Sequence, residues 1–290
     1  MSIALALVCG IVIGLVLGAL GGGGSILAVP ALVYVLGESA RDATTTSLVV
    51  IGISSAIGAI SYHRERQVRW RVGLTFGLVG IAASFAGTAL NQNVDQGVLL
   101  ACFAAVMAIA ATAMIGKSWT GRRSKLPRAS REQPWSAPRG STAGAATLTA
   151  PAPSVTRSGR GRALVGIQVV SAALLVGFLT GFLGVGGGFV VVPALVMILG
   201  FPMPVATATS LLIIALNSSV SLGIHASSHP QFDWAIIVPF TAATIIASLV
   251  GKKVASRLSG GVLTFSFAIV LLLVAVGIGI EVAAPHIGLT

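Results

Sequence analysis

Charge is scarce in this chain. Only 9% of its 290 residues are Asp, Glu, Lys or Arg, and only 7 are acidic. An ordinary soluble domain is about 25% charged, so a water-soluble globular protein is excluded. Cysteine is scarce as well: Cys9 and Cys102 lie in separate apolar runs without metal-ligand spacing, and we expect both to be buried free thiols.

Catalytic signatures are also missing. The sequence contains no His-Glu-x-x-His, nucleophile elbow or Walker loop, and no paired carboxylates within an apolar run. The glycine cluster at 184–188 follows an apolar run instead of a strand, and no acidic residue lies about 20 positions further on, so it is not a dinucleotide-binding fingerprint. We therefore expect a protein that is not an enzyme and that uses no cofactor and no metal.

Long apolar runs make up most of the chain. A transmembrane helix needs about 20 apolar residues, and two shorter apolar runs, 25–36 and 189–199, each follow directly on a glycine cluster. We predict an all-α polytopic membrane protein with about eight long spanning helices and two half-helices. The eight long runs, all without a charged side chain, are residues 2–20, 43–61, 72–90, 96–116, 163–183, 205–224, 234–251 and 261–280.

The middle of the chain has a different composition. Residues 117–162 are rich in Arg, Ser, Pro, Gly and Ala, and they carry ten Lys or Arg residues against Glu132 alone. Such a segment cannot bury enough apolar surface to offset the entropy of ordering it. We predict a basic, disordered cytoplasmic linker that joins a first membrane repeat, residues 1–116, to a second, residues 163–290.

The positive charge marks one side of the membrane. The formal net charge is +11, and 17 of the 18 Lys and Arg residues lie in the linker, in the loop 64–71 or at 252–257. Lys and Arg concentrate in cytoplasmic loops, so these three segments are predicted to be cytoplasmic, and both termini to lie on the opposite side of the membrane. The charge therefore indicates topology and contact of the linker with anionic lipid, and we expect no nucleic acid partner.

The two halves contain a repeat. Residues 14–48 align without gaps on residues 177–211, with identical residues at 18 of 35 positions, glycines, a proline and a Thr-x-Thr-Ser-Leu ending among them. By the charge distribution, the first copy starts outside and the second starts inside. We therefore predict two inverted-topology repeats, which is the architecture of many secondary transporters.

Each copy contains a helix break at which an anion can bind. Breaks at membrane depth line a cavity or are buried in protein. The helix that follows offers free N–H groups and the positive end of its dipole, and glycine lets an anion approach the backbone. The predicted substrate-binding residues are Gly21, Gly22, Gly23, Gly24 and Ser25 in the first cluster and Gly184, Gly186, Gly187 and Gly188 in the second.

A second repeated element supplies hydroxyl groups that can bind oxyanion oxygens while remaining neutral. Asn217 lies seven residues after one of them, on the same helix face, and completes the predicted site. One glycine cluster alone would be explained as well by close helix packing, but two copies in opposite orientation favour a substrate site. The hydroxyl residues are Thr44, Thr46 and Ser47 in the first copy and Thr207, Thr209 and Ser210 in the second.

At these motifs the sequence resembles the sulfite exporter TauE/SafE family of bacterial membrane transporters. The resemblance rests on the glycine clusters with the segments that follow them, residues 21–32 and 184–195, and on the Thr/Ser motifs at 43–48 and 206–211. It covers the chain apart from the linker, which is longer and more basic than the family's usual central loop. It implies transport of sulfite, sulfonates or other small organic anions such as sulfoacetate, and it leaves the direction open.

The predicted function is transport of such a small anion across the cytoplasmic membrane by alternating access. Uptake would need coupling, with the proton as the obvious ion, because a negative-inside potential opposes the entry of an anion. Two alternatives stay open at this stage: a passive anion channel, and a membrane sensor or scaffold that signals through the basic linker. The sequence predicts no oligomeric state.

Overall fold

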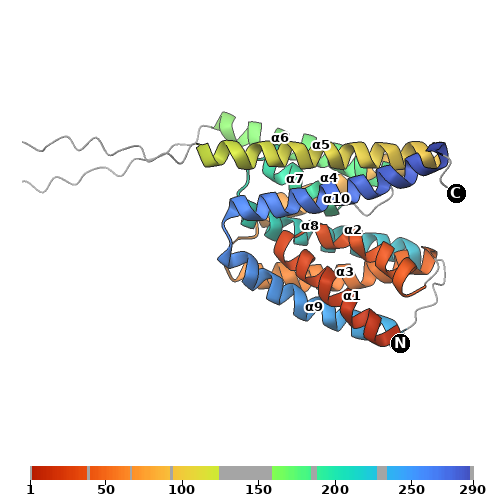
Figure 1. Ribbon diagram of the computed structural model, residues 1–290. Helices are drawn as coiled ribbons and strands as arrows, with labels where there is room; N and C mark the ends of the chain where they lie inside the picture. Colours follow the sequence, from red (N-terminus) through yellow and green to blue (C-terminus); the bar gives the residue numbers. More distant parts are fainter. Residues whose placement is uncertain are drawn as a thin grey trace, which may run out of the picture.

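The computed structural model describes residues 2–37, 40–65, 67–91, 94–123, 159–183, 188–226 and 234–287, and it contains no strand in these ranges (Figure 1). The helices are α1 (Ser2–Leu20), α2 (Gly23–Pro30), the π-helical turn η1 (Ala31–Val35), α3 (Ala40–His63), α4 (Trp70–Asn91), α5 (Gln96–Arg123), α6 (Gly159–Leu183), α7 (Gly188–Met197), α8 (Met203–Ala226), α9 (Trp234–Arg257) and α10 (Gly260–Ile287).

Most of these helices can cross a bilayer. Within the described residues, seven helices are long and apolar enough to do so: α3, α4, α5, α6, α8, α9 and α10. The eighth predicted span is α1, which has 19 residues. The predicted half-helices are α2, which continues into η1, and α7, which has 10 residues. The prediction of an all-α polytopic membrane protein is confirmed.

A proline shapes each half-helix. Pro30 is the last residue of α2 and the next turn is π-helical, whereas Pro193 lies inside α7. Proline lacks a backbone donor and clashes with the preceding turn, so it disturbs a helix at this position. Each half-helix then leads to a glycine with a positive φ, Gly37 at +74° and Gly200 at +67°.

The segments with basic charge gather at one end of the bundle. Figure 1 shows the end of α5, the start of α6 and the turn from α9 to α10 on the same side, opposite the start of α1. We call this the basic end. Both α5 and α6 run into the range predicted as linker, because α5 ends at Arg123 and α6 begins at Gly159. Residues 124–158 of the linker lie outside the described residues.

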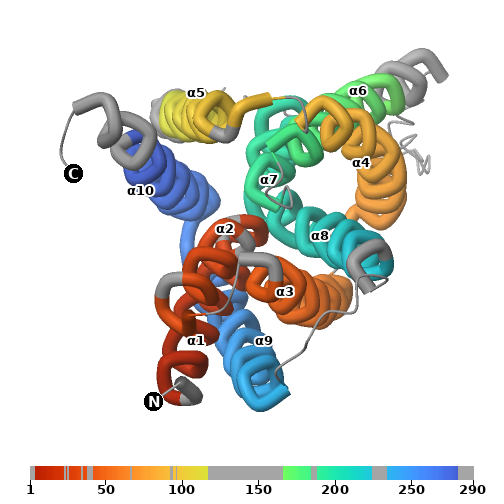
Figure 2. The backbone as a smooth tube through the Cα atoms, turned by 90° about the vertical axis from the view of Figure 1, so that its right-hand side faces the viewer, coloured from red at the N-terminus to blue at the C-terminus, as the bar shows by residue number. Residues whose placement is uncertain are grey.

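The two repeats interlock. Helices α1 to α5 correspond to α6 to α10, and the most extensive helix contacts join α1 with α9, α4 with α6, α5 with α10 and α3 with α8 (Figure 2). If each helix is replaced by its equivalent in the other repeat, the α1–α9 pair becomes the α6–α4 pair. The α5–α10 and α3–α8 pairs are each converted into themselves. The arrangement is therefore pseudo-symmetric, and each of these contacts joins one repeat to the other.

Glycines bring the paired backbones together. A Cβ on Gly14 or Gly18 of α1 would overlap a carbonyl oxygen of α9, and a Cβ on Gly177 or Gly181 of α6 would overlap one of α4. These contacts show that the sequence repeat extends beyond its first 35 aligned residues, to α4 and α9 at an offset of 164. The equivalent residues include Trp70 and Trp234, Phe76 and Phe240, Ser84 and Ser248, and Gly87 and Gly251.

Candidate functional site

The break after α1 begins with a glycine in a left-handed conformation. Gly21 has a φ of +81°, and its N–H donates to the Leu17 carbonyl oxygen at 2.8 Å. Only glycine adopts this conformation without a steric penalty, and it reverses the chain. Gly24 then packs against Ile13 and Leu17, with no room for a Cβ. The half-helix α2 therefore folds back closely along α1.

The break after α1 meets the start of α7. A Cβ on Gly22 would overlap the carbonyl oxygen of Gly188, the first residue of α7. A Cβ on Gly21 would lie 2.6 Å from Ser210 Oγ and 2.8 Å from Thr207 Cα, both at the start of α8. The structure thus brings the glycine break of the first repeat and the first residue of α7 to a common point beside the second Thr/Ser motif. We call these five residues the glycine junction.

The junction holds a buried hydroxyl group that has no protein partner. Ser210 Oγ donates to the Thr207 carbonyl oxygen at 2.8 Å. Thr207 is 1% exposed, and its Oγ1 has no hydrogen-bond partner among the described residues. Buried polar atoms are nearly always hydrogen-bonded, so the unpaired Thr207 hydroxyl is an unusual feature of the junction.

The other predicted hydroxyl residues are placed differently. Thr46 and Ser47 are buried and Thr44 is half-buried, and Ser47 Oγ donates to the Thr44 carbonyl oxygen at 2.7 Å, as Ser210 does to Thr207. Thr209 faces away from the junction, because its Oγ1 accepts the Arg69 backbone N–H at 3.3 Å. The first motif therefore copies the local geometry of the second.

Some predicted glycines are outside what the structure describes. Gly184, Gly186 and Gly187 lie outside the described residues. Gly23 is the first residue of α2 and Ser25 lies in its first turn. Of the second cluster, therefore, the structure assigns Gly188 alone to the junction.

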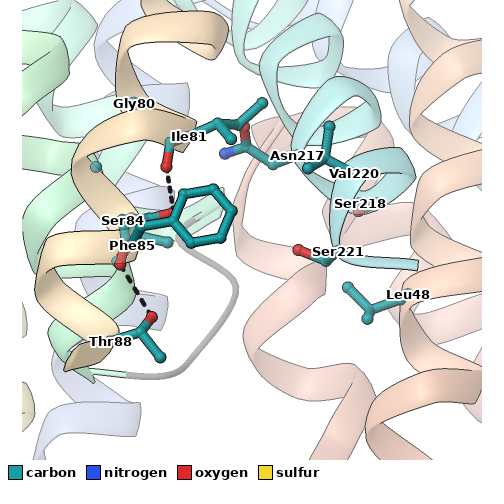
Figure 3. A pocket seen from close by; sticks show the side chains of 12 residues that line it. Leu48, Gly80, Ile81, Ser84, Phe85, Thr88, Asn217, Ser218, Val220 and Ser221 are labelled. Carbon is teal, nitrogen blue, oxygen red and sulfur yellow. Dashed lines mark hydrogen bonds between the residues drawn. The ribbon is translucent and has the colours of Figure 1, made fainter. Parts of the chain in front are cut away.

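A cavity of about 240 Å³ lies beside the junction, between α4, α6 and α8, with Leu48 of α3 at its edge (Figure 3). It contains Asn217, ten residues after Thr207 on α8, which is about 15 Å along the helix axis. Its other lining residues are Gly80, Ile81, Ser84, Phe85 and Thr88 of α4, Gly177 and Thr180 of α6, and Ser218, Val220 and Ser221 of α8.

The cavity wall is polar but uncharged. Ser84 and Thr88 donate their hydroxyl hydrogens to carbonyl oxygens of α4, at 2.8 and 2.9 Å (Figure 3), so their oxygens remain as acceptors. Asn217 faces them from α8, and its buried Oδ1 has no hydrogen-bond partner among the described residues. Within the described residues, no group of three or more His, Cys, Asp or Glu side chains could hold a metal ion. The wall can thus solvate a small polar solute without a metal.

The pseudo-symmetric counterpart of this cavity is closed. Its residues are identified from the two alignments of the repeats. At the offset of 163 that aligns residues 14–48 with 177–211, Asn217 and Ser218 correspond to Ser54 and Ser55. Ser54 and Ser55 are 0% exposed, and neither hydroxyl has a partner among the described residues. The equivalents of Leu48, Gly80, Ser84 and Thr180 are Leu211, Thr244, Ser248 and Leu17, and all four are buried. The same polar wall is therefore open in one repeat and packed shut in the other.

The sequence motifs indicated the polar face of α8 with Asn217, but not the polar residues of α4 and α6 that line the cavity. The missed residues Ser84, Thr88 and Thr180 come from helices whose polar side chains are isolated among apolar ones. A signal was present in the second alignment, at an offset of 164, where Ser84 coincides with Ser248. That alignment pairs α4 with α9 and would have identified both walls.

Comparison with known proteins decides the family. The profile of the sulfite exporter TauE/SafE family matches residues 6–278. The chain belongs to the TauE/SafE family. As a TauE/SafE protein, it is similar to a probable membrane transporter protein of Xylella fastidiosa (strain Temecula1), with 31% identity over 248 residues, covering 85% of this chain and 82% of the relative.

More distant relatives carry the same description. The probable membrane transporter protein YunE of Bacillus subtilis is 27% identical over 248 residues, covering 82% of this chain and 84% of the relative. The probable membrane transporter protein MJ0441 of Methanocaldococcus jannaschii is 24% identical over 223 residues, covering 72% and 68%. No solved structure is significantly similar to the chain. This TauE/SafE protein is therefore a multi-pass membrane protein with a transporter role.

Proposed function

We propose that this TauE/SafE protein is a secondary transporter of the bacterial cytoplasmic membrane that moves a small sulfur-containing or organic anion, such as sulfite, a sulfonate or sulfoacetate, by alternating access. The observation that carries the proposal is the contact of Gly22 with Gly188. The glycine break of the first repeat meets the start of the second repeat's half-helix there, next to the buried Thr207 hydroxyl. The anion is bound at this junction.

The junction suits an oxyanion for electrostatic reasons. The first turn of α7 offers backbone N–H groups and the positive end of the helix dipole. Gly21 and Gly22 have no Cβ, which lets Ser210 and Gly188 approach their backbone closely. The Thr207 hydroxyl supplies one more donor. None of these groups carries a full charge, so the site pays no cost for a buried cation when it is empty.

The open cavity supports alternating access. Asn217 and Ser84 line it, while its counterpart on the other side of the pseudo-symmetry axis is packed shut. Interchange of these two conformations between the repeats would switch access to the junction from one side of the membrane to the other. A potential of 100 mV, negative inside, favours anion export by ~2.3 kcal/mol per charge, so export requires no coupled ion.

A flux measurement with the Thr207→Val variant tests the proposal. The protein is reconstituted in liposomes and the flux of radiolabelled sulfite and sulfoacetate is measured. Loss of one hydrogen bond to a charged ligand costs about 1.5–3 kcal/mol, so we expect the apparent affinity to fall about tenfold or more. The matched control is Thr112→Val, because the Thr112 hydroxyl is exposed and donates within α5.

Three results would contradict the proposal. Unchanged flux in a folded Thr207→Val variant would exclude the junction as the site. A passive channel would be identified by an anion conductance that keeps rising with anion concentration and does not saturate. Anion transport would be excluded if no sulfur-containing or carboxylate anion tested shows flux, provided that a thermal unfolding measurement shows the protein to be folded.

A further inference from the structure

A cluster at the basic end closes the counterpart of the open cavity. Lys252 of α9 lies 2.8 Å from Glu65 Oε1, and its Nζ donates to the Ser61 carbonyl oxygen at 2.8 Å and to Ser61 Oγ at 2.9 Å. The ammonium group also lies 4.7 Å from the centre of the Tyr62 ring. Tyr62 in turn donates its hydroxyl hydrogen to the Gly18 carbonyl oxygen at 3.0 Å. These contacts tie α3 to α9 and α1.

The repeat makes Lys252 equivalent to a residue that lines the open cavity. At the offset of 164, Lys252 is the equivalent of Thr88, which lines the open cavity. Lys252 follows Ser248 by one turn, about 6 Å along α9, and the Ser248 carbonyl oxygen contacts Gly18 just before the break at Gly21. The ammonium group therefore lies on the wall of the closed half of the pathway, between the glycine junction and the basic end.

The two partners of the ion pair are held unequally. The Lys252 side chain is 14% exposed, whereas that of Glu65 is 43% exposed. Lys252 has two further acceptors and an aromatic ring, but Glu65 lies on the turn after α3 and is otherwise held by Gln67, whose Nε2 donates to Glu65 Oε2 at 3.2 Å. A mostly buried ammonium ion needs a negative partner. The Glu65 carboxylate is the partner that can be exchanged for another anion.

We infer that Lys252 is a second anion-binding group, at the basic end of the pathway, and that the Glu65 carboxylate occupies its place until a small oxyanion replaces it. This inference rests on the proposed transport function. An anion that arrives from the junction or from the basic end binds Lys252 and releases Glu65. The ion pair then no longer holds the turn after α3 against α9, and the polar wall at Ser54 and Ser55 becomes accessible. Binding of the anion and opening of this end are thereby the same event.

Thiol accessibility tests the inference without measuring transport. Cys9 and Cys102 are replaced by alanine, Ser55→Cys is added, and the rate of reaction with a small cationic thiosulfonate reagent is measured in nanodiscs. We expect slow reaction in this parent, because residue 55 is fully buried. Glu65→Gln removes the competing charge, and the rate should rise about tenfold or more. Thr88→Cys, which lines the open cavity and is exposed, serves as the reactive control.

Protection by an anion identifies the binding group. Methanesulfonate should slow the reaction in the Glu65→Gln variant at least about threefold relative to gluconate at equal ionic strength. This variant is already open, and an anion bound at Lys252 lies between residue 55 and the basic end, so it blocks the reagent. The protection should be lost when Lys252→Gln is added. Arg64→Gln, which alters an exposed neighbour of Glu65, should leave the parent rate unchanged.

The inference is overturned if Glu65→Gln leaves residue 55 as unreactive as in the parent, or if methanesulfonate protects equally with and without Lys252. Ser54→Cys repeats the test at the adjacent buried position should the first variant not fold. The labelling experiment does not depend on flux. A negative labelling result therefore contradicts the role of Lys252 alone, and unchanged flux in Thr207→Val contradicts the junction site alone.

Discussion

Gly18 lies against the backbone carbonyl of Ser248 with no space for a Cβ, and Gly181 lies against the carbonyl of Ser84 in the same way. The two contacts are related by the repeat. Each is the point where the first helix of one repeat touches the fourth helix of the other. Small residues let membrane helices approach at their backbones, where van der Waals contact stabilises the pair.

We predict that Gly18→Ala or Gly181→Ala destabilises the protein. The added methyl group must displace a backbone, and overpacking of this kind typically costs about 1–3 kcal/mol. Thermal unfolding in detergent should show a lower midpoint for both variants. The matched controls are Gly166→Ala and Gly277→Ala, whose added Cβ has no atom within 4 Å and should raise or preserve stability, because alanine favours a helix.

A second prediction separates backbone strain from intrusion into the site. Alanine at a positive φ costs about 1–2 kcal/mol, so Gly21→Ala and Gly200→Ala should both lower the unfolding midpoint, and Gly21→Ala should lower it further because overpacking adds to the strain. A Cβ at Gly21 meets Ser210 and Thr207, whereas one at Gly200 has no atom within 4 Å. Sulfite flux should therefore be lost in Gly21→Ala and kept in Gly200→Ala. Equal flux in the two variants would contradict the assignment of the junction.

A third prediction concerns the open cavity. Asn217→Leu removes a buried oxygen that has no partner among the described residues, and removing an unsatisfied polar group is neutral or stabilising. We expect an unfolding midpoint that is unchanged or higher, together with flux reduced about tenfold or more because the cavity loses its amide. Reduced stability with normal flux would show that Asn217 is a structural residue. Ser219→Ala is the control, since Ser219 is exposed and donates within α8.

A fourth prediction follows from the interlocked repeats. Trypsin should cleave the basic linker in sealed inside-out vesicles but not in right-side-out vesicles, because the charge distribution places the linker in the cytoplasm. The two fragments should co-purify in mild detergent, because α1 packs on α9 and α4 packs on α6. Fragments that separate without denaturant would show that the contacts between repeats are weak. Cleavage from the opposite side would reverse the predicted topology.

Much of this fold is predictable from the sequence, because apolar runs and glycine clusters are local signals. The half-helix before Gly200, the break at Gly21 and the inverted repeat were all expected. The pairing of α1 with α9 was not, because the helix faces that meet lipid and those that meet protein are both apolar, and hydrophobicity cannot distinguish them. Glycine spacing is the usable signal: Gly10, Gly14 and Gly18 recur every four residues on the face that contacts α9.

The site was predictable in part for a related reason. The sequence indicated that the glycine clusters and the Thr/Ser motifs belong together, and the structure brings Gly21, Gly22 and Gly188 to Thr207 and Ser210. Which hydroxyl lacks a partner depends on side-chain geometry. Thr207 and Thr209 are two residues apart in the same motif, yet Thr207 Oγ1 has no partner among the described residues and Thr209 accepts the N–H of Arg69.

The partnership of α1 with α9 also sets the order of events during synthesis. Helix α1 is synthesised more than 200 residues before its partner α9. Until α9 is inserted, the glycine face of α1 exposes its backbone to lipid. A chain that stops after the first repeat has therefore inserted α1 and α4 without their main partners. The nascent chain in the membrane can form the complete bundle only after α9 has been made. We therefore expect a truncated product to be a substrate for membrane proteases.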